Sequence, residues 1–122
     1  MHELSIATSV LHIAEEYAQQ EGITRIRSIT LRVGELSSVH EQSLRFGFEL
    51  VTQGTVLEGA TLQLEHLPVI IYCPQCQSEK TLSGIQSFRC PDCQSLSGDI
   101  RQGRELDVES IEWDDPSLTP SS

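Results

Sequence analysis

The chain contains four cysteines, and their spacing predicts a metal site. They form two identical Cys-Pro-x-Cys units, residues 73–76 and 90–93, separated by thirteen residues in a chain of 122. Both thiolates of a C-x-x-C turn can point at one ion, so two such turns supply the four sulfurs of a structural zinc site. The proline of each unit fixes φ in a tight loop. We therefore predict that Cys73, Cys76, Cys90 and Cys93 bind structural Zn(II).

Two other interpretations of these cysteines are open at the level of sequence. Four cysteines can form two disulfides, although a gap of two residues within each pair favours a shared metal. Iron can occupy the same sulfur tetrahedron, as in a rubredoxin-like electron carrier. Zinc is preferred over iron because a closed four-sulfur site usually does structural work.

The second residue, His2, belongs to a different kind of metal-binding pattern. The α-amine of Met1, the His2 imidazole and the peptide nitrogen between them can close chelate rings around one ion. The peptide nitrogen of Glu3 can complete a plane, and an all-nitrogen square plane suits Ni(II) or Cu(II) better than tetrahedral zinc. The amine and the imidazole must both lose their protons to bind. A histidine at this position does not by itself establish such a site.

Composition excludes several classes of function. The formal net charge of −10 repels a phosphate backbone, so we expect no nucleic-acid binding. No apolar run approaches the roughly 20 residues that span a bilayer, and no basic segment begins the chain. We therefore expect no membrane insertion and a location in the reducing cytoplasm. The sequence also lacks the common catalytic motifs, and we expect that it is not an enzyme.

Apolar periodicity predicts two helices. The first runs from Leu4 to Gly22, so it begins almost at the N-terminus. The pattern Ser38-x-x-Glu41 has the form of a capping box with Ser38 as N-cap, and a second helix would follow and end at Gly54. Its predicted buried stripe is Leu44, Gly47, Phe48 and Val51, widened by Phe46 and Leu50.

Three strands are predicted to accompany these helices. They are residues 29–33, residues 61–72 with an interruption at Pro68, and residues 106–113, where a shift of apolar parity indicates a bulge or an edge. Residues 77–89 are predicted to form a hairpin or loop with a turn at Gly84, and Ile85 and Phe88 to pack over the metal. Residues 95–103 are predicted to be a loop.

These elements predict an α+β fold, with two helices on a small three-stranded sheet and an inserted four-cysteine zinc module. We predict an α+β domain of residues 1–68 and 105–113, a zinc-binding module of residues 69–104 and a disordered tail of residues 114–122.

Several motifs resemble the HypA/HybF family of hydrogenase maturation factors. They are MHELS at residues 1–5, VGELS at 33–37, SLRFGFE at 43–49, GTVLEGA at 54–60, the two CPxC units and GREL at 103–106. The resemblance covers the chain from Met1 to about Trp113. A Met-His-Glu start combined with a four-cysteine module is not shared with generic zinc ribbons.

The resemblance implies a nickel metallochaperone with Ni(II) as transient cargo and Zn(II) as a structural ion. His2 and Glu3 would form the nickel site with the Met1 amine and backbone nitrogens, and the four cysteines would hold the zinc. The implied partners are a hydrogenase maturation GTPase and the precursor of the [NiFe]-hydrogenase large subunit. We expect a monomer or a weak dimer.

The chain departs from the family pattern in two places. It has no proline in residues 39–41, just before the second predicted helix, where His40 lies and is not expected to be a ligand. The tail that carries proline and serine after Trp113 is particular to this chain. Two alternative functions stay open, a zinc-ribbon adaptor that only binds another protein and a rubredoxin-like iron electron carrier.

Overall fold

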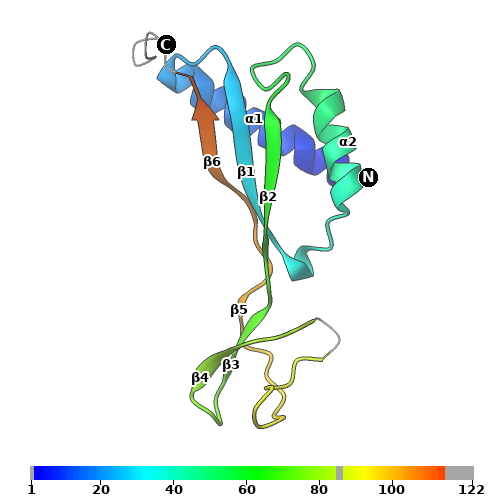
Figure 1. Ribbon diagram of the computed structural model, residues 1–122, viewed down its shortest axis with the longest axis vertical. Coiled ribbons are helices and arrows are strands. Elements are labelled where there is room, and N and C mark those ends of the chain that lie inside the picture. The colour runs from blue at the N-terminus through cyan, green and yellow to red at the C-terminus, as the bar shows by residue number, and fades with distance from the viewer. Residues whose placement is uncertain (1, 85–86, 115–122) are drawn as a thin grey trace. The chain divides into compact units, whose positions relative to one another are not determined.

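The computed structural model describes residues 2–84 and 87–114 (Figure 1). Its elements in chain order are α1 (His2–Glu21), β1 (Ile26–Gly34), the 3-10 helix η1 (Glu35–Ser37), α2 (Glu41–Val51), β2 (Thr61–Leu67), β3 (Ile70–Cys73), β4 (Ser78–Thr81), β5 (Ile100–Gln102) and β6 (Leu106–Trp113). The strands form two three-stranded sheets with the orders β2-β1-β6 and β4-β3-β5. The predicted α+β fold is confirmed, and the cysteine module has a small sheet of its own. None of the helices in the described residues is long and apolar enough to cross a membrane.

Two compact units make up the chain. The first comprises Met1–Leu31, Val39–Gln63 and Val108–Ser122, and the second comprises Arg32–Ser38 and Leu64–Asp107. The first unit therefore holds both helices, and the second holds η1 and the cysteine module. The predicted boundaries at residues 68/69, 104/105 and 113/114 stay a prediction, and the tail residues 115–122 lie outside the described part of the chain.

Helices α1 and α2 pack closely because small residues separate them. Ala7 and Ala14 of α1 are fully buried. A side chain on Gly47 of α2 would begin 3.4 Å from a methyl carbon of Leu4. Since this is an ordinary van der Waals distance, the α2 backbone lies close to the first turn of α1, beside which α2 lies in Figure 1.

The prediction that Phe46 and Leu50 widen the buried stripe of α2 is wrong. The buried residues of α2 are Leu44, Gly47 and Phe48, whereas Phe46 is 65% exposed and Leu50 is 50% exposed. Each helical residue turns the side chain by about 100°, so Phe46 lies on the opposite side of α2 from Leu44. The helix therefore carries apolar side chains on two faces, and only one of them meets the core.

The predicted capping box is also wrong. The N-cap of α2 is His40, whose ring Nδ1 accepts a hydrogen bond from the Ser43 N–H at 3.2 Å. Ser38 ends η1 in the left-handed region, with φ of 61°. Ser38 is therefore the C-cap of η1 and does not cap α2. The His40 ring has the capping role that hydroxyl groups usually have.

Polar side chains join the central strand β1 to its two neighbours. Ser28 Oγ donates to Glu112 of β6 at 2.7 Å, and Thr30 Oγ1 donates to Gln63 of β2 at 3.0 Å. The buried residues Ile29, Leu31 and Val33 alternate with these polar positions, as predicted for a strand with one buried face. Strand β6 lies at a sheet edge, which accounts for its weak apolar alternation.

The second sheet corrects the prediction of a loop at 95–103, where β5 lies, and places strand β4 in the segment 77–89 for which a hairpin or loop is predicted. Strand β3 pairs antiparallel with β4 through Ile71↔Lys80 and Cys73↔Ser78, and on its other side it pairs with β5. Its apolar core is Val69, Ile71 and Leu82, against which Leu36, Phe88 and Ile100 pack. Phe88 thus packs within the module, while Ile85 lies outside the described residues. Pro68 and Val69 separate β2 from β3, as predicted.

Two glycines meet where the second unit begins and ends in sequence. The Gly34 N–H donates to Glu105 O, and the Leu36 N–H donates to Gly103 O, each at 2.7 Å. A Cβ built on Gly34 would lie 2.1 Å from Gly103 O, so no side chain fits there. Gly103 itself has φ of 131°, which only glycine adopts readily.

Candidate metal centres

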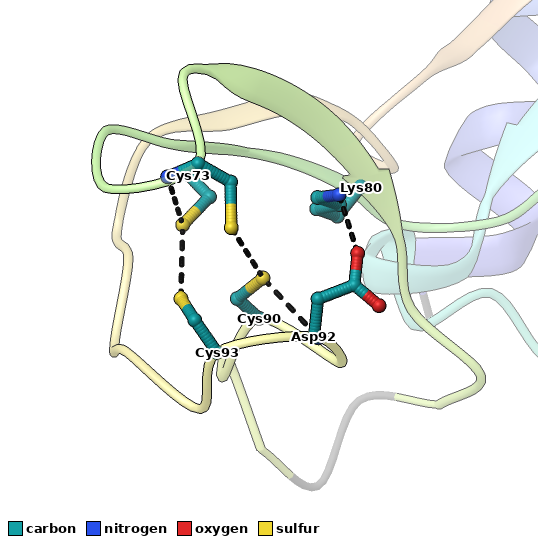
Figure 2. Close-up of polar contacts among 6 residues, drawn as sticks. Cys73, Lys80, Cys90, Asp92 and Cys93 are labelled. Carbon is teal, nitrogen blue, oxygen red and sulfur yellow. Dashed lines mark hydrogen bonds and ion pairs between the residues drawn. The ribbon is translucent and has the colours of Figure 1, made fainter.

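The four cysteines converge on one point of the second unit. All four Sγ atoms lie within 4.8 Å of one another. Two contacts drawn in Figure 2 link the units, since Cys73 Sγ lies 3.5 Å from Cys93 Sγ and Cys76 Sγ lies 3.8 Å from Cys90 Sγ. Each close pair thus joins one CPxC unit to the other. Cys73 and Cys90 are buried, and Cys76 and Cys93 are partly exposed.

These separations fit a tetrahedral ion. With Zn–S bonds of about 2.3 Å, the sulfurs of a regular tetrahedron lie about 3.8 Å apart, close to the separations of 3.5 and 3.8 Å in these two pairs. A disulfide requires about 2.05 Å, and all four cysteines are free. The disulfide interpretation is therefore wrong. Iron and zinc need nearly the same sulfur geometry, so the donor set itself does not separate them.

The two CPxC units fold into matching turns. In the first, the Cys76 N–H donates to Cys73 Sγ at 3.4 Å, and in the second the Asp92 N–H donates to Cys90 Sγ at 3.4 Å. The residue after each unit, Gln77 or Gln94, has positive φ, 54° and 66° respectively. The turns therefore orient the sulfurs by backbone hydrogen bonds, and each turn ends in a conformation that side chains disfavour.

Polar contacts outside the sulfurs link the turns to each other and to the sheet. Lys80 of β4 forms an ion pair with Asp92 in the second turn, as Figure 2 shows. The Ser95 hydroxyl donates to the Gln75 side chain of the first turn. Ser97 Oγ donates to Tyr72 O at 2.6 Å. These contacts connect the second turn to β3, to β4 and to the first turn, in addition to the four sulfurs.

The thiols of the cluster differ in acidity. Hydrogen bonds with the Ser95 side chain and backbone lower the pKa of Cys93 to about 6. The pKa of Cys76 is raised to about 12, first by its hydrogen bonding with Cys93 and then by burial. A dication among the four sulfurs would favour the thiolate form of each.

The other predicted site lies at the start of α1, in the first unit. His2 is the first residue of α1, and Met1 lies outside the described residues. The Glu3 carboxylate accepts a hydrogen bond from the backbone N–H of His40 at 3.2 Å. The structure thus brings Glu3 to the N-cap of α2. Of the other histidines, His12 and His66 are exposed on α1 and β2, and His40 caps α2.

The comparison with protein families covers nearly the whole chain. A family model described as hydrogenase/urease nickel incorporation, metallochaperone, hypA, matches residues 1–113. The chain belongs to the HypA family. The resemblance predicted from the motifs is therefore confirmed. HypA is a metallochaperone and a maturation factor rather than an enzyme.

Curated relatives agree with this assignment. The chain is 44% identical over 112 residues to the hydrogenase maturation factor HypA of Chloroflexus aurantiacus, covering 92% of this chain and 98% of that protein. It is 42% identical over 123 residues to HypA of Roseiflexus sp., covering 99% and 100%. It is 43% identical over 116 residues to HypA of Streptomyces avermitilis, covering 94% and 88%.

Solved structures of HypA share the fold. The solution structure of the Ni metallochaperone HypA from Helicobacter pylori matches with a TM-score of 0.64 at 22% identity, covering 90% of this chain and 95% of that one. A second HypA solution structure matches with a TM-score of 0.67 at 24% identity, covering 92% and 95%.

The sequence interpretation overlooked Lys80, Asp92 and Ser95 as supports of the cluster. One signal for Ser95 was present, because the repeat extends beyond the cysteines to Cys-Pro-x-Cys-Gln-Ser in both units. The second copy places its serine at position 95, next to Cys93. Nothing in the sequence signalled the ion pair between Lys80 and Asp92, since it depends on β4.

Proposed function

We propose that this member of the HypA family binds Ni(II) at its N-terminus and delivers it to the large-subunit precursor of a [NiFe]-hydrogenase. The proposed donors are the Met1 amine, the His2 imidazole and the amide nitrogens of His2 and Glu3. All four are nitrogens, and they can adopt the square-planar arrangement that Ni(II) favours.

The observation that carries this proposal is the position of His2 and Glu3 in the first turn of α1. The first-turn amides of any α-helix lie outside its ladder of i→i−4 hydrogen bonds. A metal that takes amide nitrogens at these positions therefore breaks no bond of the ladder. In the middle of a helix, the same chelate would disrupt several.

The charge of such a site also suits this location. The N-terminal end of a helix carries a partial positive charge, which opposes a bare dication. Two amide nitrogens that have lost their protons bring two negative charges and neutralise Ni(II). The loaded site is then nearly neutral, so the end of α1 tolerates it.

We assign structural Zn(II) to Cys73, Cys76, Cys90 and Cys93. This assignment is supported by the closed set of four sulfurs and by the contacts that tie both turns to the second sheet. A site without an open position is suited to hold its ion, whereas a site of amine, imidazole and amides can load and release one. The zinc would stabilise the fold of the predicted zinc-binding module, residues 69–104.

The proposed partners are the hydrogenase maturation GTPase and the large-subunit precursor, in the cytoplasm. The chain would work as a monomer or a weak dimer. Its acidic character, with a net charge of −10, suits basic surfaces on these proteins.

The decisive experiment measures Ni(II) binding to the untagged chain with its native Met1. Calorimetry and the visible absorption of planar nickel are read on this chain, on His2→Ala and on a version with residues added before Met1. His12→Ala is the matched control, because it removes a histidine from the same helix. We expect both N-terminal changes to weaken binding by more than about 100-fold, the upper range for loss of an outer-shell contact.

Equal binding by all four proteins would place nickel elsewhere and end the proposal. Absence of nickel binding in the native chain would favour a zinc-ribbon adaptor instead. Metal analysis of the same protein tests the sulfur site, since zinc leaves it colourless and iron in four thiolates absorbs visible light.

A further inference from the structure

The outer face of α2 exposes two large apolar side chains. Phe46 is 65% exposed and Leu50 is 50% exposed, and they stand four residues apart, so they lie next to each other along the helix. Contiguous exposed apolar area, unlike single scattered apolar side chains, marks surfaces that contact another molecule.

A hollow of about 510 Å³ lies beside α2 in the same unit. Phe48 and Leu62 line it together with the carboxylate-bearing residues Glu49 and Glu58. Its one basic residue, Arg45, is engaged internally, because it pairs with Glu41 at 3.0 Å and donates to Leu62 O at 2.7 Å. The hollow therefore has an apolar floor and an acidic rim.

The two acidic groups of the rim are available to a ligand. Within residues 2–84 and 87–114, neither the Glu49 nor the Glu58 carboxylate forms an ion pair. A lysine or arginine side chain placed in the hollow would lay its aliphatic stem on Phe48 and Leu62 and bring its charge to these carboxylates.

We propose that Phe46, Leu50 and this hollow form a docking face for a partner protein. The partner would present a lysine or arginine to Glu49 and Glu58, and apolar side chains to Phe46 and Leu50. The charges are complementary, and an apolar centre with a charged rim is the usual anatomy of a transient interface.

The docking face lies beside the start of α1. Leu4 packs against Gly47, and Glu3 accepts a hydrogen bond from the His40 N–H, so both residues after His2 contact α2. A protein seated on α2 would thus lie next to the nickel-binding end. That this protein receives or supplies nickel rests on the proposed function, whereas the docking face itself does not.

The test uses the full chain with its native N-terminus and two purified probes, the large-subunit precursor and the maturation GTPase. One double variant removes the apolar pair, Phe46→Ser with Leu50→Ser. Its control is Ile13→Ser, because Ile13 of α1 is also 50% exposed. A second double variant, Glu49→Lys with Glu58→Lys, reverses the rim charge. Its control is Glu16→Lys with Glu21→Lys, which changes the net charge equally.

We expect each docking-face variant to weaken binding to at least one probe by tenfold or more, with each control within about twofold of the unaltered chain. Binding of the unaltered chain should weaken with added salt, because the rim charges are exposed. Nickel binding should not change in any of these variants. All seven substituted positions, those of the controls included, are exposed, so circular dichroism should show an unchanged fold.

Three results would overturn the docking face. The first is that both docking-face variants bind the probes as tightly as the unaltered chain does, and the second is that the unaltered chain binds neither probe. The third is that the chain self-associates and that Phe46→Ser with Leu50→Ser abolishes this self-association. The last would assign the face to a second copy of the chain. If nickel binding proves independent of His2 while the variants still weaken docking, the proposed function fails and the docking face stands.

Discussion

The Glu3 carboxylate accepts a hydrogen bond from the backbone N–H of His40 at 3.2 Å. His40 is the N-cap of α2, so the carboxylate lies at the positive end of that helix, where a negative charge is favourable. The contact ties the first turn of α1 to the start of α2. In the proposed nickel site, Glu3 therefore contributes its backbone nitrogen, and its side chain positions the turn.

Substitutions of Glu3 separate these two contributions. Glu3→Ala should lower the free energy of unfolding by about 1 kcal/mol, because it removes an acceptor at a helix N-terminus. Glu3→Gln keeps an acceptor oxygen, so its nickel affinity should stay within a few-fold of the native value. Denaturant unfolding and nickel calorimetry measure the two effects. A loss of nickel binding in Glu3→Gln as large as in His2→Ala would make the carboxylate itself a ligand.

Nickel affinity should depend steeply on pH. Binding displaces protons from the Met1 amine and the His2 imidazole, two kinds of group with reference pKa values of about 7.7–8.0 and 6.5, and from two amides that are protonated throughout. Since acid favours the metal-free form, affinity falls as pH falls. We expect about three protons released per nickel between pH 6.5 and 7.7 and about four below pH 6.5. Calorimetry in buffers of different ionisation enthalpy counts them, and fewer than two protons would exclude amide ligands.

Removal of the ion from the four cysteines should unfold the second sheet and spare the helices. Structural zinc contributes on the order of 10–16 kcal/mol of apparent binding energy to such modules. Hydrogen exchange after chelation should show lost protection in β3, β4 and β5, with α1 and α2 unchanged. The variant Cys73→Ser with Cys76→Ser should reproduce the pattern without chelator. Loss of protection throughout α1 in either experiment would show that the two units fold as one.

Gln77 and Gln94 offer a way to stabilise the cysteine turns. Both have positive φ, a conformation that costs a residue with a side chain about 1–2 kcal/mol. Gln77→Gly or Gln94→Gly should raise the stability of the module by up to about 1 kcal/mol, after the entropy that glycine loses on folding. Gln77→Ala serves as the control, since alanine keeps the penalty. Stability measured on the metal-loaded chain should rise for glycine only.

Gly34→Ala should be strongly destabilising. The new Cβ would lie 2.1 Å from Gly103 O, which belongs to the backbone and cannot move aside without disturbing the pairing around Glu105. We expect a loss of about 3 kcal/mol or more. Gly98→Ala is the matched control, because nothing lies within 4 Å of its added Cβ and the effect should be small. Comparable stability of the two variants would contradict the close approach.

Regular spacing made much of this structure predictable. The repeated CPxC unit identified the cysteine cluster, and helical periodicity from Leu4 onward identified α1. Pro68 marked the break between β2 and β3, because proline cannot donate in a strand. These signals are local, and each acts through the backbone or through the ligand geometry of one ion.

The errors arose where distant residues decide. Strand β4, Ser78–Thr81, contains one residue that favours strands, Thr81, and β5 has only three residues. Both exist because β3 offers them partners. Serine is a common N-cap residue, but Ser38 ends η1 instead. His40 caps α2 through its ring. Phe46 and Leu50 fit an apolar pattern, but they lie on a face of α2 that does not meet the core.

The contact between Gly34 and Gly103 also bears on how the sequence can vary. The two positions lie far apart along the chain, yet the carbonyl group of Gly103 occupies the space that a side chain on Gly34 would need. A mutation at Gly34 has no single compensating change at Gly103, because the obstacle is a carbonyl group that every residue carries. Random mutagenesis with selection for function should therefore recover glycine at 34 while Gly98 drifts freely. The contact therefore links the VGELS and GREL motifs, because the backbone of the second restricts which residue the first can carry at position 34.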